Sequence, residues 1–151
     1  MNDHETGIRP ATLDDAPALA ELSTELGYPT SAAAAKDRLA PILGSDDHAV
    51  IVAASGDGAV VGWIHVFLAQ RVESDPFAEL GGFVVGELHR RRGIGRQLLA
   101  AAEAWVTGRS VVKLRVRSRT SRDEARVFYE RLGFRETKRQ RVMDKALGEG
   151  E

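Results

Sequence analysis

Several residue types and patterns are absent from this 151-residue chain, and each absence excludes a class of function. The chain has no cysteine, which excludes disulfide bonds, thiolate metal ligands and a cysteine nucleophile. Its four scattered histidines have no spacing typical of a metal site, so we expect no metal. No apolar run approaches the roughly 18 residues of a membrane span, and the N-terminus is polar and acidic. We therefore expect a cytoplasmic protein with no membrane partner.

The composition is that of a folded globular protein. Hydrophobic residues make up 43% of the chain and charged residues 28%, and the length fits one domain spanning residues 1–151. The net charge is only −1, but residues 1–75 carry 4 basic and 12 acidic side chains, whereas residues 76–151 carry 17 and 10. A basic half favours an anionic ligand and an acidic half a cationic one. Segregated, solvated surface charges without a ligand are the alternative.

The spacing of apolar residues predicts an α/β domain around a mixed sheet. Apolar residues recur at three- and four-residue intervals, which predicts helices over 13–26, 32–43, 94–106 and 123–132. Apolar or alternating runs predict strands over 8–12, 48–54, 59–69, 79–85 and 111–117. We also expect a closing pair of strands over 134–140 and 142–145. The segment 71–78 is polar and contains Pro76, so we expect a loop there.

The turn between the predicted strand 79–85 and the helix 94–106 carries the clearest chemical signal. It reads Arg90-Arg91-Arg92-Gly93-Ile94-Gly95-Arg96. Backbone N–H groups at a helix start lack intrahelical partners, and glycines let a bulky anion approach them closely. The pattern therefore fits a pyrophosphate, although it also fits a tight turn with a solvated basic rim. A P-loop is absent, and a dinucleotide fingerprint would need glycine at Leu98.

A second segment adds a family resemblance. It reads Ala125-Arg-Val-Phe128-Tyr129-Glu130-Arg-Leu132-Gly133-Phe134. Together with Arg90-x-x-Gly93-x-Gly95 it resembles the GNAT N-acetyltransferase superfamily, and the order of elements fits along nearly the whole chain. The resemblance implies a single-domain α/β (α+β) GNAT fold. Such a fold has about four helices and a mixed, mostly antiparallel sheet of six to seven strands, with splayed central strands.

The resemblance implies acetyl-CoA as the co-substrate. In the family, the pantetheine arm lies between the strands that match 80–85 and 111–117, often beside a bulge, for which Gly81-Gly82 is suited. The residues implied to hold the coenzyme are Phe83, Val84, Val85, Arg90, Arg91, Arg92, Gly93, Ile94, Gly95, Arg96 and Arg122. Arg122 departs from the family's usual asparagine, and Glu87 stands where many members have proline.

The resemblance also implies a general acid. Tyr129 matches the tyrosine that protonates the leaving thiolate in the family. A thiol titrates near ~8.5 and a tyrosine near ~10, so a tyrosine hydroxyl can donate this proton. A half-buried ring that packs beside Phe128 and Phe134 is the alternative interpretation of Tyr129.

The acceptor amine needs a base, because only its neutral form attacks the thioester. Glu79 falls where histone-acetylating members of the family carry a glutamate base, although it also fits an exposed carboxylate at a strand end. Glu73, Asp75 and His65 are alternatives that could act through a water. Leu26-Gly27-Tyr28-Pro29 matches the acceptor-lining region, which makes Glu25 and Tyr28 candidate substrate contacts.

The implied function is direct acetyl transfer to a primary amine of a small cationic molecule, such as an aminoglycoside or a polyamine. Acetylation of a protein lysine or N-terminal amine is an alternative, as is a non-catalytic acetyl-CoA-binding module. A nucleic-acid-binding module is a further alternative, but the basic positions 115–122 lack interleaved aromatic residues, so we expect no nucleic-acid partner. Many relatives dimerise through their last strands, and the segment 134–145 could form such a homodimer.

Overall fold

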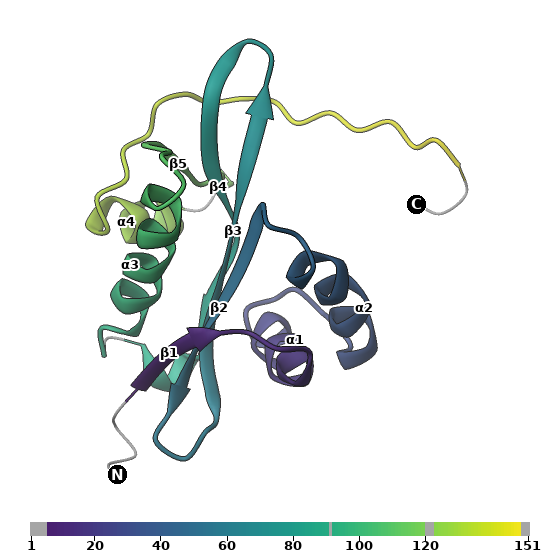
Figure 1. Ribbon diagram of the computed structural model, residues 1–151, viewed down its shortest axis with the longest axis vertical. Helices are drawn as coiled ribbons and strands as arrows, with labels where there is room; N and C mark the ends of the chain where they lie inside the picture. Colours follow the sequence, from purple (N-terminus) through teal and green to yellow (C-terminus); the bar gives the residue numbers. More distant parts are fainter. Residues whose placement is uncertain (1–5, 91, 120–122, 149–151) are drawn as a thin grey trace. The chain divides into compact units, whose positions relative to one another are not determined.

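The computed structural model describes residues 6–90, 92–119 and 123–148, which form two compact units that meet at the Val116–Arg117 boundary in the sequence. A five-stranded sheet in the order β1-β2-β3-β4-β5 lies at the centre of the first unit (Figure 1). Its strands are β1 Thr6–Pro10, β2 His48–Ser55, β3 Val60–Arg71, β4 Ser74–Val85 and β5 Leu114–Arg115. The first four strands pair antiparallel and β5 pairs parallel to β4, so the sheet is mixed, as predicted.

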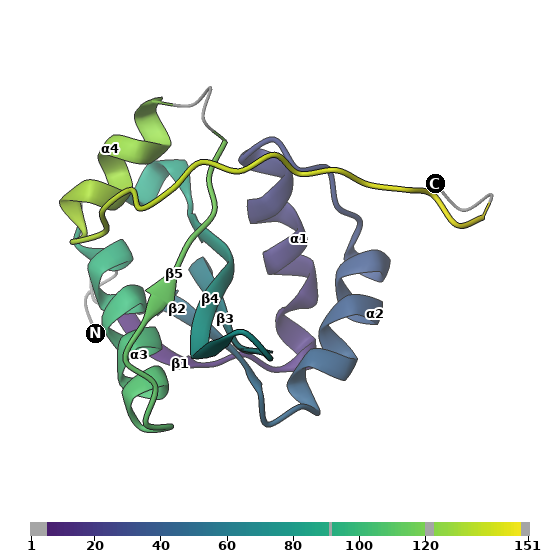
Figure 2. The ribbon, with the colours of Figure 1, turned by 90° about the horizontal axis from the view of Figure 1, so that it is seen from above.

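Helices cover both faces of this sheet. The helices α1 (Ala16–Glu25) and α2 (Ala32–Leu43) lie side by side on one face, and α3 (Ile94–Thr107) covers the other (Figures 1 and 2). Apolar side chains at helical spacing in α3, such as Leu98 and Ala102, are fully buried. Two apolar layers therefore enclose β2 and β3. None of the helices in the described ranges is both long and apolar enough to cross a bilayer.

A partly buried ion pair ties β1 to the start of α1. Arg9 makes two hydrogen bonds to Asp15, Nη1 to Oδ2 at 2.8 Å and Nη2 to Oδ1 at 2.9 Å. The backbone N–H of Thr12 also donates to Asp15 Oδ2, at 2.8 Å. The hydrogen bonds from Arg9 are the main reason why the pKa of Asp15 lies below its ordinary value. This contact fixes how the chain passes from the sheet edge into α1.

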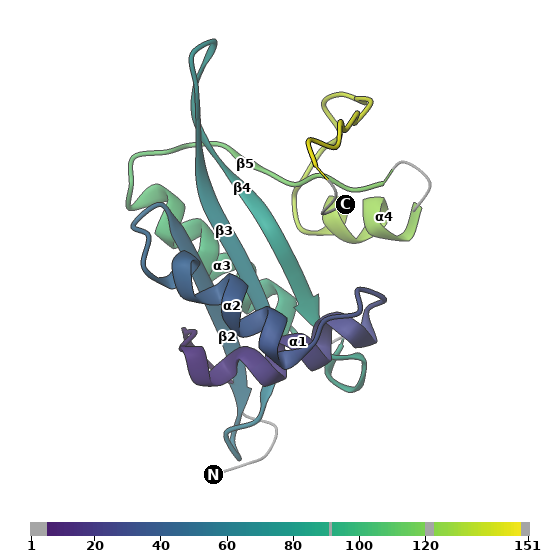
Figure 3. The same cartoon turned by 90° about the vertical axis from the view of Figure 1, so that its right-hand side faces the viewer.

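The predicted loop over 71–78 is wrong, because β3 and β4 form one long hairpin that turns between Arg71 and Ser74 (Figure 3). Proline is tolerated here because the register shifts between the pairs Ala69↔Phe77 and Arg71↔Ser74. Two residues of β4, one of them Pro76, therefore lie opposite one residue of β3. A bulge of this kind needs no ladder hydrogen bond from the proline.

A second irregularity in β4 confirms the bulge predicted at Gly81-Gly82. His65 pairs with Gly82 and Val66 pairs with Leu80, so Gly81 is the extra residue. A Cβ atom on Gly81 would lie 2.5 Å from Nδ1 of His65, and one on Gly82 would overlap the ring of Trp63. Only glycine leaves room for these two rings against the bulge.

The strand predicted over 111–117 is much shorter than expected. Only Leu114 and Arg115 form β5, and they pair with Ala78 and Glu79. The parallel pairing of β4 and β5 thus ends at Glu79, and the residues of β4 from Leu80 to Val85 lie beyond it.

The second unit contains α4 (Asp123–Arg131), close to its predicted span. The predicted closing strands over 134–140 and 142–145 are wrong, because the chain from 134 to 148 forms no strand. One residue between two strands is too short for a hairpin turn, and a segment becomes a strand only where a partner supplies hydrogen bonds. The described sheet accordingly has five strands rather than six to seven.

Candidate active site

The turn that follows β4 presents backbone N–H groups at the start of α3. Gly93, the N-cap of α3, has a φ of 78°, a left-handed conformation that favours glycine. The N–H of Gln97 donates to the carbonyl of Gly93 at 3.1 Å, which closes the first turn of the helix. Between described residues, the N–H groups of Gly93 and Ile94 make no backbone hydrogen bond. No atom lies within 4 Å of a Cβ built on Gly93, so an anion can approach these amides.

Arginine side chains surround this helix start. Arg90 Nε donates to the carbonyl of Val85 at 3.2 Å, and Arg92 Nη1 lies 3.4 Å from Nδ1 of His89. Arg96 is exposed in the first turn of α3, and Arg91 lies outside the described residues. Cations are unfavourable near the positive N-terminus of a helix dipole. Several arginines at this position therefore indicate a site for a bound anion.

After the bulge, the backbone N–H and C=O groups of successive β4 residues point to opposite edges of the strand. The N–H of Gly86 donates to the carbonyl of Val61 at 2.8 Å, toward the β3 side. Because successive residues of a strand direct their backbone groups to opposite edges, those of Phe83 and Val85 point away from β3. Val84, between them, is buried. The backbone groups of Phe83 and Val85, which are predicted to pair with pantetheine, thus lie on the edge of β4 that faces away from β3.

A row of side chains crosses the sheet on the opposite face from α3. His48 of β2 pairs with Phe67 of β3, which pairs with Glu79 of β4, and paired residues project to the same face. His65, two residues before Phe67 in β3, shares this face. Glu79 is half-buried, whereas the alternative carboxylates Glu73 and Asp75 are exposed at the hairpin tip. Only Glu79 among the three carboxylates lies in this row.

His48 and His65 form a pair that the sequence does not disclose. Nδ1 of His48 lies 2.9 Å from Nε2 of His65, and the two rings stack with centroids 5.2 Å apart. Burial, and secondarily the charge of His48, lowers the pKa of His65 to about 4, so its ring is neutral at pH 7. The alternation of β2 and β3 is visible in the sequence, but the register that joins these histidines across 17 residues is not.

The two candidate substrate contacts lie at and just after the end of α1. The ring of Tyr28 is 49% exposed, as a contact for a ligand would require. Oε1 of Glu25 accepts a hydrogen bond of 2.6 Å from the backbone N–H of Glu87, the second residue after the end of β4. Glu25 therefore already has a partner within the chain.

In the second unit, local contacts of α4 hold the predicted acid. The N–H of Phe134 donates to the carbonyl of Tyr129 and that of Gly133 to the carbonyl of Glu130, while Gly133 has a φ of 96°. These two bonds form a Schellman motif, which explains the Leu-Gly-Phe sequence after the helix. The half-buried ring of Tyr129 packs edge-on against Phe128 and Phe134, with centroids 5.2 Å and 5.6 Å away. Arg122 lies outside the described residues.

Comparison with known proteins establishes the family. The sequence profile of the Acetyltransferase (GNAT) family matches residues 16–134, most of the chain. The chain belongs to the GNAT family. A curated GNAT relative, aminoglycoside N(6')-acetyltransferase type 1 of Stenotrophomonas maltophilia, is 35% identical over 136 residues, 87% of this chain and 88% of the relative.

Solved structures share the GNAT fold. Aminoglycoside antibiotic 6'-N-acetyltransferase AAC(6')-Ih from Acinetobacter baumannii has a TM-score of 0.84 at 18% identity, over 95% of this chain and all of that one. AAC(6')-Iy, in complex with the bisubstrate analog CoA-S-monomethyl-acetylneamine, has a TM-score of 0.82 at 24% identity, over 94% of this chain and 99% of that one. The protein is thus a GNAT-type N-acetyltransferase with the GNAT fold predicted from its two motifs.

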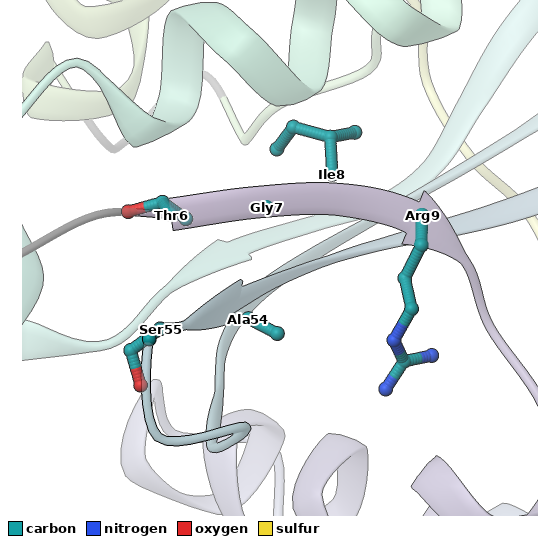
Figure 4. Close-up of a pocket in the computed structure, with 7 residues that line it drawn as sticks. Thr6, Gly7, Ile8, Arg9, Ala54 and Ser55 are labelled. Atoms are coloured by element: carbon teal, nitrogen blue, oxygen red, sulfur yellow. The ribbon is translucent and has the colours of Figure 1, made fainter. Parts of the chain in front are cut away.

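A hollow on the first unit of this GNAT enzyme has none of the predicted site residues in its lining. The hollow lies along β1 and the end of β2 (Figure 4). Ile8 and Arg9 project from β1 to opposite sides of that strand. Its lining consists of Thr6, Gly7, Ile8, Arg9, Ala54, Ser55 and Gly56. None of these is a predicted site residue, and we assign the hollow no role in acetyl transfer.

Proposed function

We propose that this enzyme transfers the acetyl group of acetyl-CoA directly to a primary amine of a small cationic molecule of the aminoglycoside or polyamine kind. The observation that carries the proposal is the 35% identity, over most of both chains, to an aminoglycoside N(6')-acetyltransferase. The 12 acidic against 4 basic side chains of residues 1–75 add support, because they favour approach of a cationic acceptor.

The coenzyme's pyrophosphate binds the N–H groups at the start of α3, between Arg91 and Arg96. The left-handed Gly93 and the open space beside it support this part of the proposal, as do the surrounding arginines. The pantetheine arm runs along β4 from Phe83 to Val85, whose outward backbone groups can pair with its amides. Arg122 is proposed as a further phosphate contact.

Reaction begins when the neutral amine attacks the thioester carbonyl. The C–N bond forms, the C–S bond breaks, and the electron pair leaves with the coenzyme's sulfur. Tyr129 donates its hydroxyl proton to that sulfur. The acetylated amine loses one proton to solvent, and solvent returns a proton to the Tyr129 oxygen. The Schellman motif at the end of α4 and two edge-on aromatic contacts hold Tyr129, which supports a fixed orientation for its hydroxyl.

The amine must lose a proton before it can attack. An alkylamine of pKa ~10.4 is about 99.9% protonated at pH 7, a deficit of about 3 pKa units or ~4 kcal/mol. Glu79 is proposed as the base, acting directly or through a water. Its half-buried position in the row with Phe67 and His48, two residues before the Gly81 bulge, favours it over Glu73 and Asp75.

The test combines calorimetry and kinetics. Titration of acetyl-CoA into the purified protein should release heat, and release of free thiol should accompany turnover of aminoglycosides or polyamines in a panel of amines. The panel should include neutral amines, anionic amines and lysine-containing peptides at equal concentration. Turnover of peptides alone would replace the small cationic acceptor with a protein. Absence of coenzyme binding would refute the proposed coenzyme site.

A further inference from the structure

The end of α1 is joined to the turn that follows β4. Glu25, the last residue of α1, accepts a hydrogen bond of 2.6 Å at Oε1 from the backbone N–H of Glu87. One turn earlier on the same helix face, Leu22 packs against Gly86, where a Cβ atom would lie 3.2 Å from Leu22 Cδ2. Two residues of α1, one apolar and one charged, thus contact two consecutive residues of the turn.

The N–H of Glu87 occupies a special position. Gly86 is the N-cap and Glu87 the first residue of η2 (Glu87–His89), a single 3₁₀ turn closed by the His89 N–H on the carbonyl of Gly86 at 2.9 Å. The N–H of a first helical residue has no partner within the helix, and proline is common there because it lacks that group and fixes φ. This chain retains the N–H, and the carboxylate of Glu25 satisfies it.

We infer that Glu25 is a positioning residue, which holds the turn between β4 and α3 by accepting the Glu87 N–H. This hydrogen bond stiffens the turn, as a proline at position 87 would. The inference rests on the proposed coenzyme site, since residues 86–93 lead directly into the amides of α3. Glu25 then acts on acetyl-CoA through the turn and does not contact the acceptor amine.

Four single variants and two double variants isolate this hydrogen bond. Glu25→Ala removes the acceptor, and Glu87→Pro removes the donor. The backbone suits the proline, because Gly86 has φ −56° and ψ 142°, the extended region that a residue before proline requires. Glu87→Ala is the matched control, since it removes the side chain and retains the N–H. Glu25→Gln keeps an acceptor oxygen without the charge.

The readouts are the Kd of acetyl-CoA by calorimetry and the KM of the acceptor amine. Loss of one hydrogen bond predicts that Glu25→Ala raises the Kd of acetyl-CoA about three- to tenfold. Glu25→Gln should keep the Kd within about twofold, because its amide oxygen still accepts. In the Glu87→Pro background, Glu25→Ala should change the Kd less than about twofold, whereas in the Glu87→Ala background it should retain its full effect.

Three results would overturn the inference. An unchanged coenzyme Kd in Glu25→Ala would show that the bond does not position the turn. An equal loss in the Glu87→Pro background would show that Glu25 acts by another route. A raised acceptor KM in Glu25→Gln with an unchanged coenzyme Kd would make Glu25 an acceptor contact. If Glu87→Pro does not fold, the Glu25→Ala and Glu25→Gln pair still decides, and wild-type titration tests the proposed coenzyme site separately.

Discussion

Mild acid should destabilise this protein through one histidine. The pKa of His65 is lowered from 6.5 to about 4, first by burial and then by the charge of His48. The unfolded chain therefore binds a proton at this ring below about pH 6.5, whereas the folded chain does so only near pH 4. Between these values the unfolded state holds more protons, so the free energy of unfolding falls as the pH falls.

The magnitude follows from the same shift. A difference of about 2.5 pKa units corresponds to at most about 3.4 kcal/mol, reached well below pH 4. Between pH 7 and pH 5 the linkage gives about 1.8 kcal/mol. The ring is only half-buried, and solvent screening reduces the effect, so we expect a loss of about 1 kcal/mol.

Urea denaturation followed by tryptophan fluorescence at pH 7 and pH 5 measures this loss. The variant His65→Gln removes the titrating group and can still hydrogen-bond to His48, so its free energy of unfolding should change about 1 kcal/mol less than that of the wild type. His48→Gln should keep most of the acid sensitivity, because burial is the larger cause of the shift. Equal losses in the wild type and His65→Gln would refute the reasoning.

Three further predictions concern catalysis and coenzyme binding. Tyr129→Phe should lower kcat about 100-fold with the Kd of acetyl-CoA unchanged; equal turnover by thiol release would remove the general acid. Glu79→Gln should lower kcat/KM about 100-fold at pH 7 and much less at pH 10, where the amine deprotonates unaided; a pH-independent loss would contradict a role as base. Gly93→Ala and Gly58→Ala place alanine at φ 78° and 90° without a clash, so both should lose about 1 kcal/mol of stability in thermal denaturation. Calorimetry should show weaker acetyl-CoA binding only for Gly93→Ala, and weakening by both variants would argue against the proposed turn.

Local patterns were sufficient where a structure depends on neighbouring residues. Helical spacing predicted α2 over 32–43, and the structure has the same bounds: Ser31 accepts the N–H of Ala34 at its start, and Gly44 ends the helix. Gly133 predicted the end of α4 to within one residue, because the Schellman motif found there involves only residues close in sequence. The glycine turn before α3 belongs to the same class. In each case the stabilising contacts lie within a few residues of one another.

Patterns that depend on a distant partner were misread or missed. The strands predicted over 134–145 do not form, and Pro76 suggested a loop although it lies within β4. Both outcomes depend on which strand lies alongside, and the sequence of one segment does not carry that information.

The sequence by itself determined the family, the element order as far as α4, and the glycine turn before α3, because these rest on local spacing and on two motifs. Only the tertiary structure decided the row of His48, Phe67 and Glu79, and the bond from Glu87 to Glu25 across 62 residues. Strand register and helix docking bring such residues together, and both are set by packing of the whole sheet, which no short segment encodes.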